Sequence, residues 1–89
     1  MPRSEVEIVN KLGLHARPAM VFVDLASTFQ AEIKVRKDDN EVDGKSIMMM
    51  MMLAAAKGST IVVDTDGADA DQAMTAIQAL IADKFGEGE

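Results

Sequence analysis

Segments with alternating apolar and polar residues take turns with segments of helical spacing along this chain of 89 residues. Strand-like alternation occupies residues 5–8, 31–37, 41–43 and 60–66. Helical spacing, or a continuous apolar run with helix start and stop signals, occupies residues 16–29, 47–57 and 69–85. Because the two periods place apolar side chains on one face of a strand or a helix, the pattern predicts the element order β-α-β-β-α-β-α. We expect a single domain over residues 1–89.

Each expected strand has one polar face, so an antiparallel sheet covered by helices on a single side satisfies the pattern. Aromatic residues make up only 3% of the chain. The core of this α+β domain must therefore consist of aliphatic residues and methionine around Phe22, Phe29 and Phe85. Asp69 with Gln72 three positions later predicts a capping box at the start of the last helix.

Composition excludes several classes of partner. The net charge is -6 and tryptophan and tyrosine are absent, which argues against nucleic-acid binding. One histidine without cysteine does not make a typical metal site, and no phosphate-binding loop or nucleophile elbow is present, so no metal or cofactor is expected. The longest apolar run, residues 47–56, is far shorter than the roughly 20 residues needed to span a bilayer. We expect a cytoplasmic protein with protein partners and no membrane association.

His15, the single histidine, lies where a glycine-containing loop meets the start of the first expected helix. The backbone N–H groups and dipole of a helix start favour an anion, and the guanidinium of Arg17 offers it a rigid fork of donors. Neutral imidazole is present at cell pH and can attack phosphorus. Considered alone, the same pair of residues also fits a solvated surface histidine or a helix cap.

Two sequence motifs give a more specific indication of function than His15 and Arg17 alone. Gly13-Leu14-His15-Ala16-Arg17-Pro18-Ala19 is followed about thirty residues later by Gly44-Lys45-Ser46-Ile47-Met48. This pair resembles the HPr family, the histidine phosphocarriers of the bacterial phosphotransferase system, whose length and element order the chain follows from Glu5 to Phe85. The resemblance implies an open-faced β-sandwich, a four-stranded antiparallel sheet with three helices on one face.

The resemblance also implies the chemistry. His15 is expected to accept a phosphoryl group from enzyme I, on the imidazole nitrogen nearer the backbone, and to donate it to an enzyme IIA. Arg17 is expected to contact the phosphoryl group. The protein would then be a monomeric carrier with a transient phosphohistidine, and not an independent enzyme.

Ser46 has two interpretations. It is a good N-cap for the helix that begins at Ile47, and capping alone explains a serine there. In HPr relatives of many bacteria the matching serine is phosphorylated by a dedicated kinase, HPr kinase/phosphorylase. A phosphate there would add negative charge to a docking surface. A purely regulatory binding module controlled by Ser46, with His15 idle, is therefore the alternative function.

The methionine run after Ser46 has two arcs of side chains at about 100° per residue, and only one arc can face the sheet. One interpretation is that the run only fills the core, because methionine adapts to irregular gaps. The other is an exposed patch beside His15 that docks several unlike partners. That patch would consist of Met20, Val23, Ile47, Met48, Met51 and Met52, leaving Met49, Met50 and Leu53 to face the sheet.

The recipient of the phosphate stays open. Glycine often occupies the position of Met49 in HPr proteins of sugar transport, and residues 51–55 look more like the nitrogen-related branch. That branch feeds a regulatory enzyme IIA instead of a sugar transporter. Both sugar transport and nitrogen-related regulation therefore remain as hypotheses.

Overall fold

A computed structural model of the chain describes residues 3–9, 13–53 and 56–86. Its strands are β1 (Arg3–Glu7), β2 (Glu32–Lys37), β3 (Asn40–Asp43) and β4 (Thr60–Asp66). Its α-helices are α1 (Ala16–Ala26), α2 (Ile47–Met52) and α3 (Ala70–Ala82), and a short 3-10 helix follows at Lys84–Gly86. The predicted order of elements is confirmed.

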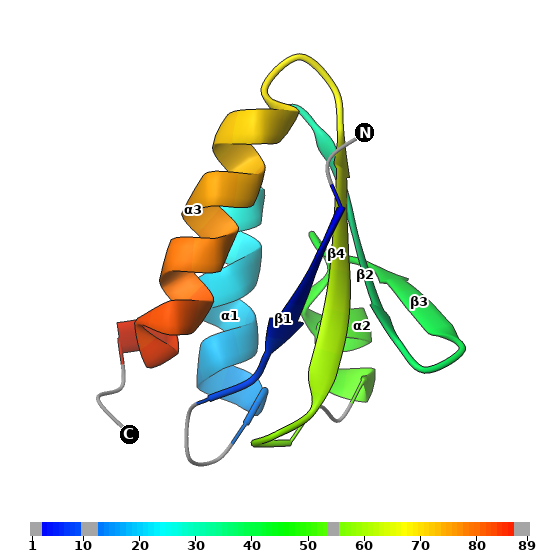
Figure 1. Cartoon of the computed structure of the whole chain (residues 1–89), viewed down its shortest axis with the longest axis vertical. Helices are drawn as coiled ribbons and strands as arrows, with labels where there is room; N and C mark the ends of the chain where they lie inside the picture. The colour runs from blue at the N-terminus through cyan, green and yellow to red at the C-terminus, as the bar shows by residue number, and fades with distance from the viewer. Residues whose placement is uncertain (1–2, 10–12, 54–55, 87–89) are drawn as a thin grey trace.

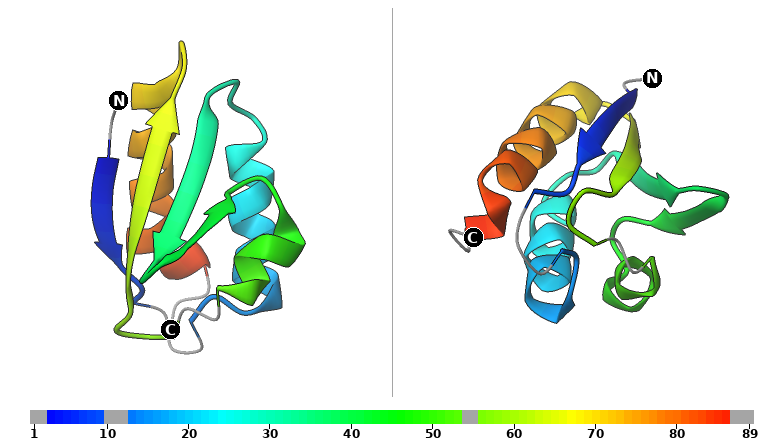
Figure 2. Two further views of the ribbon diagram at one scale, coloured as in Figure 1. Left: turned by 90° about the vertical axis from the view of Figure 1, so that its right-hand side faces the viewer. Right: turned by 60° about the horizontal axis from the view of Figure 1, so that its bottom comes forward.

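The four strands form one antiparallel sheet in the order β1-β4-β2-β3. All three α-helices cover the same face of this sheet (Figures 1 and 2). α1 packs against both α2 and α3, while α3 lies over β1 and β4 and α2 contacts β3. The predicted open-faced sandwich is confirmed. β1 begins earlier than predicted because its pairing with β4 already starts with Arg3 opposite Asp64.

The core lies between the sheet and the helices. β4 turns Ile61, Val63 and Thr65 toward the helices, and the three side chains are at most 1% exposed. The buried Thr65 hydroxyl donates a hydrogen bond of 2.9 Å to the Ala70 carbonyl, which satisfies the one polar group on this stripe. The intervening residues of the sheet point to the outer face, where Arg3 and Asp64 form an ion pair. Period-two alternation therefore divides an apolar face from a charged one.

α1 ends at Ala26, before the predicted end at Phe29. The amides of Thr28 and Phe29 donate to the carbonyls of Leu25 and Ala26, three residues back. These bonds are of the tighter 3-10 type, so the α-helical hydrogen-bond pattern ends before them. The Thr28 hydroxyl also donates to the Leu25 carbonyl at 2.7 Å. Phe29 still packs against the core from this turn, which explains why its position fits the helical spacing.

α2 ends at Met52, although the apolar run with its helix start and stop signals predicted residues 47–57. Gly58, the glycine after this range that was expected to end the helix, belongs instead to the turn before β4. The Gly58 amide donates to the Ile8 carbonyl at 2.8 Å, so the chain is already aligned beside the end of β1 before β4 begins. A positive φ of 89° at Gly58 suits this turn. Residues 54–55 of the predicted helix lie outside the described residues.

The predicted capping box at α3 is wrong. Asp69 does precede the helix, but its side chain makes no capping bond to α3. Its carboxylate instead accepts hydrogen bonds of 2.8 Å each from the backbone amides of Gln30 and Ala31, which lead into β2. Because these two amides have no strand or helix partner in that connection, they compete successfully for the carboxylate.

Candidate functional site

His15 directly follows two buried residues, Gly13 and Leu14. Gly13 is buried and has a φ of 70°, a conformation that favours glycine, and Leu14 is 4% exposed in the core. His15 itself is half-buried and has an extended backbone as the N-cap of α1. Its carbonyl accepts the first intrahelical bond, from the Ala19 amide at 3.0 Å. His15 therefore lies at the start of α1, as predicted.

The first turn of α1 suits an anion. The amides of Ala16 and Arg17 belong to that turn, where the helix offers them no intrahelical acceptor, and both residues are exposed. Pro18 follows without an N–H, so it adds no further donor and fits the start of a helix. The turn contains no acidic side chain. A phosphoryl group beside His15 would therefore meet backbone donors, a helix dipole and the Arg17 guanidinium.

Ser46 is the N-cap of α2, as predicted. Its Oγ accepts a hydrogen bond of 3.3 Å from the Met49 amide, and the residue is half-buried. The preceding turn needs a glycine because a Cβ on Gly44 would lie 2.7 Å from Ile33 Cγ2. The Gly44 amide also donates to the Ile33 carbonyl at 2.7 Å. Close packing against β2 therefore sets the position of Ser46.

Lys45 has a role that the sequence did not indicate. Its ammonium donates a hydrogen bond of 2.8 Å to the Phe29 carbonyl, which joins the start of α2 to the turn after α1. The Lys45 amide donates to the Asp43 carboxylate at 2.9 Å. The lysine of the second motif therefore has a structural role. Its partner, the Phe29 carbonyl, is sixteen residues away, and no pattern along the chain indicates that contact.

The methionine run presents the predicted arc to solvent. The members of this arc are 39–74% exposed and line a shallow apolar depression: Ile47, Met48, Met51 and Met52. Met20 of α1 is 50% exposed. On the other arc Met50 is fully buried and Leu53 is 5% exposed, whereas Met49 is 39% exposed and does not join the core.

Val23 does not belong to this exposed surface. The side chain is 6% exposed and is part of the core cluster, so the prediction that it lies in the patch is wrong. Val23 follows Pro18, Ala19 and Phe22 on the face of α1 that turns inward. Helical spacing placed it near the boundary of this face, and the packing of α1 between α2 and α3 decided on which side it falls.

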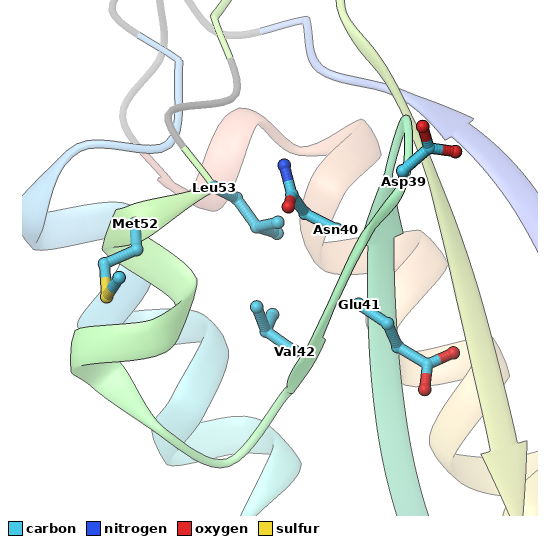
Figure 3. A pocket seen from close by; sticks show the side chains of 6 residues that line it. All are labelled: Asp39, Asn40, Glu41, Val42, Met52 and Leu53. Carbon is cyan, nitrogen blue, oxygen red and sulfur yellow. The ribbon is translucent and has the colours of Figure 1, made fainter.

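A second cavity of about 350 Å³ lies between the β2–β3 hairpin and the end of α2 (Figure 3). Val42, Leu53 and the Asn40 amide point into this space, while the carboxylates of Asp39 and Glu41 point away toward the other side of the hairpin. This follows from strand alternation, which sends neighbouring side chains to opposite faces. The cavity therefore gathers no pair of carboxylates and no nucleophile.

The described residues contain neither a metal-ligand cluster nor a membrane-spanning helix. Within residues 3–9, 13–53 and 56–86, no three side chains of histidine, cysteine, aspartate or glutamate gather closely enough to hold a metal ion. No helix in these same segments is long and apolar enough to cross a bilayer.

A family model, two relatives and a solved structure each match nearly the whole chain. A family model described as "PTS HPr component phosphorylation site" matches residues 2–83. Phosphocarrier protein HPr of Neisseria meningitidis is 55% identical over 89 residues, with 100% of each chain covered. Phosphocarrier protein NPr of Escherichia coli is 41% identical over 86 residues, which cover 96% of each chain. A crystal structure of HPr from Thermoanaerobacter tengcongensis superposes with a TM-score of 0.94 at 45% identity, over 98% of each chain.

Proposed function

Because this chain belongs to the HPr family of phosphocarriers of the phosphotransferase system, we propose that His15 accepts a phosphoryl group from enzyme I and donates it to an enzyme IIA. The observation that carries the proposal is the position of His15 as the N-cap of α1, with the exposed Arg17 in the first turn. HPr family proteins work with enzyme I and enzyme IIA in this system.

The transfer needs only one nucleophilic atom from this chain. The imidazole nitrogen nearer the backbone attacks phosphorus, a nitrogen–phosphorus bond forms, and the bond to the donor group on enzyme I breaks. Donation to enzyme IIA reverses these roles. The first turn of α1 and Arg17 stabilise the phosphoryl oxygens, and half-burial of His15 leaves the group accessible to the next acceptor. A carrier must hold its phosphate without trapping it.

The surface around this site supports docking and regulation as further parts of the proposal. Met20 and the exposed arc of α2 provide an adaptable apolar contact for enzyme I and enzyme IIA. Ser46, at the start of α2, is the candidate for phosphorylation by HPr kinase/phosphorylase. The positions of His15 and Arg17 favour the carrier over a regulatory module in which His15 is idle. The sugar-transport or nitrogen-related recipient, the single-domain organisation and the cytoplasmic location remain predictions.

The proposal is tested by incubating the protein with enzyme I and phosphoenolpyruvate, then measuring the mass and acid lability of the product. The wild-type protein should gain one acid-labile phosphoryl group, and the variants His15→Ala and His15→Gln should gain none. Circular dichroism checks that both variants are folded. A wild-type protein that gains no acid-labile phosphate, or a folded His15 variant that gains it, contradicts the proposal. Addition of enzymes IIA from each branch then identifies the recipient.

A further inference from the structure

The methionines of this protein fall into two groups by exposure. The chain has eight methionines, of which seven are described. Those with exposed side chains are Met20 at 50%, Met48 at 74%, Met49 at 39%, Met51 at 44% and Met52 at 74%. Met50 is fully buried and Met74 is 7% exposed. A helix of six residues thus carries four accessible thioethers and one protected thioether.

Exposure matters because a thioether is oxidised by hydrogen peroxide without help from a second group. The sulfur lone pair attacks one peroxide oxygen, a sulfur–oxygen bond forms, and the oxygen–oxygen bond breaks. Sulfur loses two electrons to become a sulfoxide, and the second peroxide oxygen takes up a proton and leaves as water. The product is polar, and methionine sulfoxide reductases return it to the thioether. Burial within the folded core blocks access to the sulfur.

We propose that the exposed methionines of α2, above all Met48 and Met52, form a reversible oxidation site for hydrogen peroxide that weakens phosphoryl transfer from enzyme I. The inference rests on the proposed function, since enzyme I must dock on this surface. Met48, Met51 and Met52 line the apolar depression with Ile47. A sulfoxide there places a strong hydrogen-bond acceptor in a contact that offers mainly apolar atoms, and its burial is costly.

The fold itself should tolerate this oxidation. The oxidised side chains point to water, while Met50 and Leu53 hold α2 in the core and Ser46 caps its start. The phosphoryl-accepting imidazole is left chemically unchanged. α1 packs against α2, and the start of α1 lies toward the same end of the molecule as the end of α2 (Figure 2). Enzyme I that approaches the start of α1 therefore meets the oxidised surface.

The first test measures where oxygen is added. The folded protein is treated with dilute hydrogen peroxide, and each sulfoxide is located from fragment ions by mass spectrometry. Met48 and Met52 should react first, Met51, Met20 and Met49 more slowly, and Met50 and Met74 last. Met50 is an internal control because its sequence neighbours are also methionines. Oxidation of Met50 as fast as Met48 and Met52, in protein that circular dichroism shows to be folded, overturns the inference.

The second test measures transfer before and after oxidation. At a low carrier concentration, the rate with enzyme I and phosphoenolpyruvate should fall roughly tenfold or more, as burial of an unpaired polar group predicts. Treatment with methionine sulfoxide reductases should restore it. Phosphorylation by phosphoramidate, a small donor that needs no docking surface, should change less than twofold, about 0.4 kcal/mol. An unchanged enzyme I rate, or an equal loss with phosphoramidate, overturns the inference.

Matched variants test whether the loss of transfer rate from enzyme I comes from oxidation of the exposed methionines of α2. The triple variant Met48→Leu, Met51→Leu, Met52→Leu keeps apolar side chains but removes their sulfur, and Met74→Leu removes a buried sulfur. Each protein is compared with its own untreated rate. The triple variant should keep most of its rate after oxidation, and Met74→Leu should lose as much as wild type. Equal sensitivity of the triple variant overturns the inference. A wild-type protein that takes no phosphate before oxidation contradicts the proposed function, and the inference falls with it.

Discussion

Two side chains that precede helices in this protein use their oxygens in different ways. Ser46 accepts a hydrogen bond from the amide of Met49 in its own helix, at 3.3 Å. Asp69 precedes α3, yet its carboxylate accepts from the amides of Gln30 and Ala31, which are 39 and 38 residues away in the chain. The first bond is local and follows from residue type and position. The second joins two connections at the same end of the sheet, so it is a tertiary contact that the local sequence does not predict.

Replacement of Ser46 separates the capping role from the effect of charge. Ser46→Asp keeps an N-cap oxygen, so stability should stay within about 0.5 kcal/mol, while the added charge slows transfer from enzyme I. Ser46→Ala removes the cap and should cost about 1 kcal/mol of stability with a smaller effect on transfer. Urea denaturation and the transfer rate measure the two effects. If the alanine variant slows transfer as much as the aspartate variant, charge is not the cause.

Asp69 should make stability depend on pH. The hydrogen bond from the Gln30 amide is the largest cause that lowers the pKa of the Asp69 carboxyl, and the Ala31 amide and the charge of Lys45 add to it. Because the folded-state pKa lies below the unfolded value, the carboxylate stabilises the fold fully above about pH 4. This stabilisation is lost as the pH falls through the folded-state pKa.

The measurement is the free energy of unfolding of wild type and of Asp69→Asn, at about pH 6 and about pH 3. The variant should be less stable at the higher pH, and the difference should shrink at the lower pH. Asp24→Asn, at an exposed position on α1, is the matched control and should show no comparable change. A difference for Asp69→Asn that is constant with pH would show that the carboxylate charge is not involved.

At the scale of elements, α2 depends most on its surroundings. A helix of six residues is too short to be stable alone in water. It is held by the Ser46 cap, by the Lys45 bond to the Phe29 carbonyl and by the burial of Met50. Its remaining methionines are free to serve as surface because one buried side chain and two polar bonds position the helix.

Replacement of the methionines at positions 49 and 50 tests whether the burial of Met50 holds α2 in place. Met50→Ala removes a fully buried side chain and should reduce the free energy of unfolding by about 2–5 kcal/mol. Met49→Ala removes a side chain that is 39% exposed and should cost about 1 kcal/mol or less. Urea denaturation of the two variants under the same conditions measures the difference. Equal losses would mean that the burial of Met50 does not hold the helix.

As a whole, the molecule has two unlike faces. The helical side encloses the core and carries the exposed methionines, while the outer face of the sheet is charged. On that face Arg3 Nε lies 2.5 Å from Asp64 Oδ1, and Lys34 stands opposite Asp64 in the neighbouring strand. Lys34 Nζ also lies 3.7 Å from Glu32 Oε1. Stacking a second sheet on this face would bury these charges.

The same features predict a monomer. β1 and β3 are the edge strands of the sheet, and both carry exposed charged residues, which disfavour pairing with a second chain. The net charge of -6 adds repulsion between copies. Sedimentation velocity over a range of concentrations should therefore show one species with the mass of a single chain, 9.6 kDa. A concentration-dependent species of twice that mass would contradict this prediction.

The sequence by itself determined the order of elements, the range of β4, the start of α1 after His15 and the cap at Ser46. These features depend on side-chain periodicity and on contacts within a few residues, which the order of amino acids states directly. Only the tertiary structure decided that Val23 is buried, that α2 ends at Met52 and that Asp69 binds the connection before β2. Each of these depends on which segment, distant in sequence, supplies a surface or a hydrogen-bond partner. Local sequence patterns do not indicate which distant segment that is.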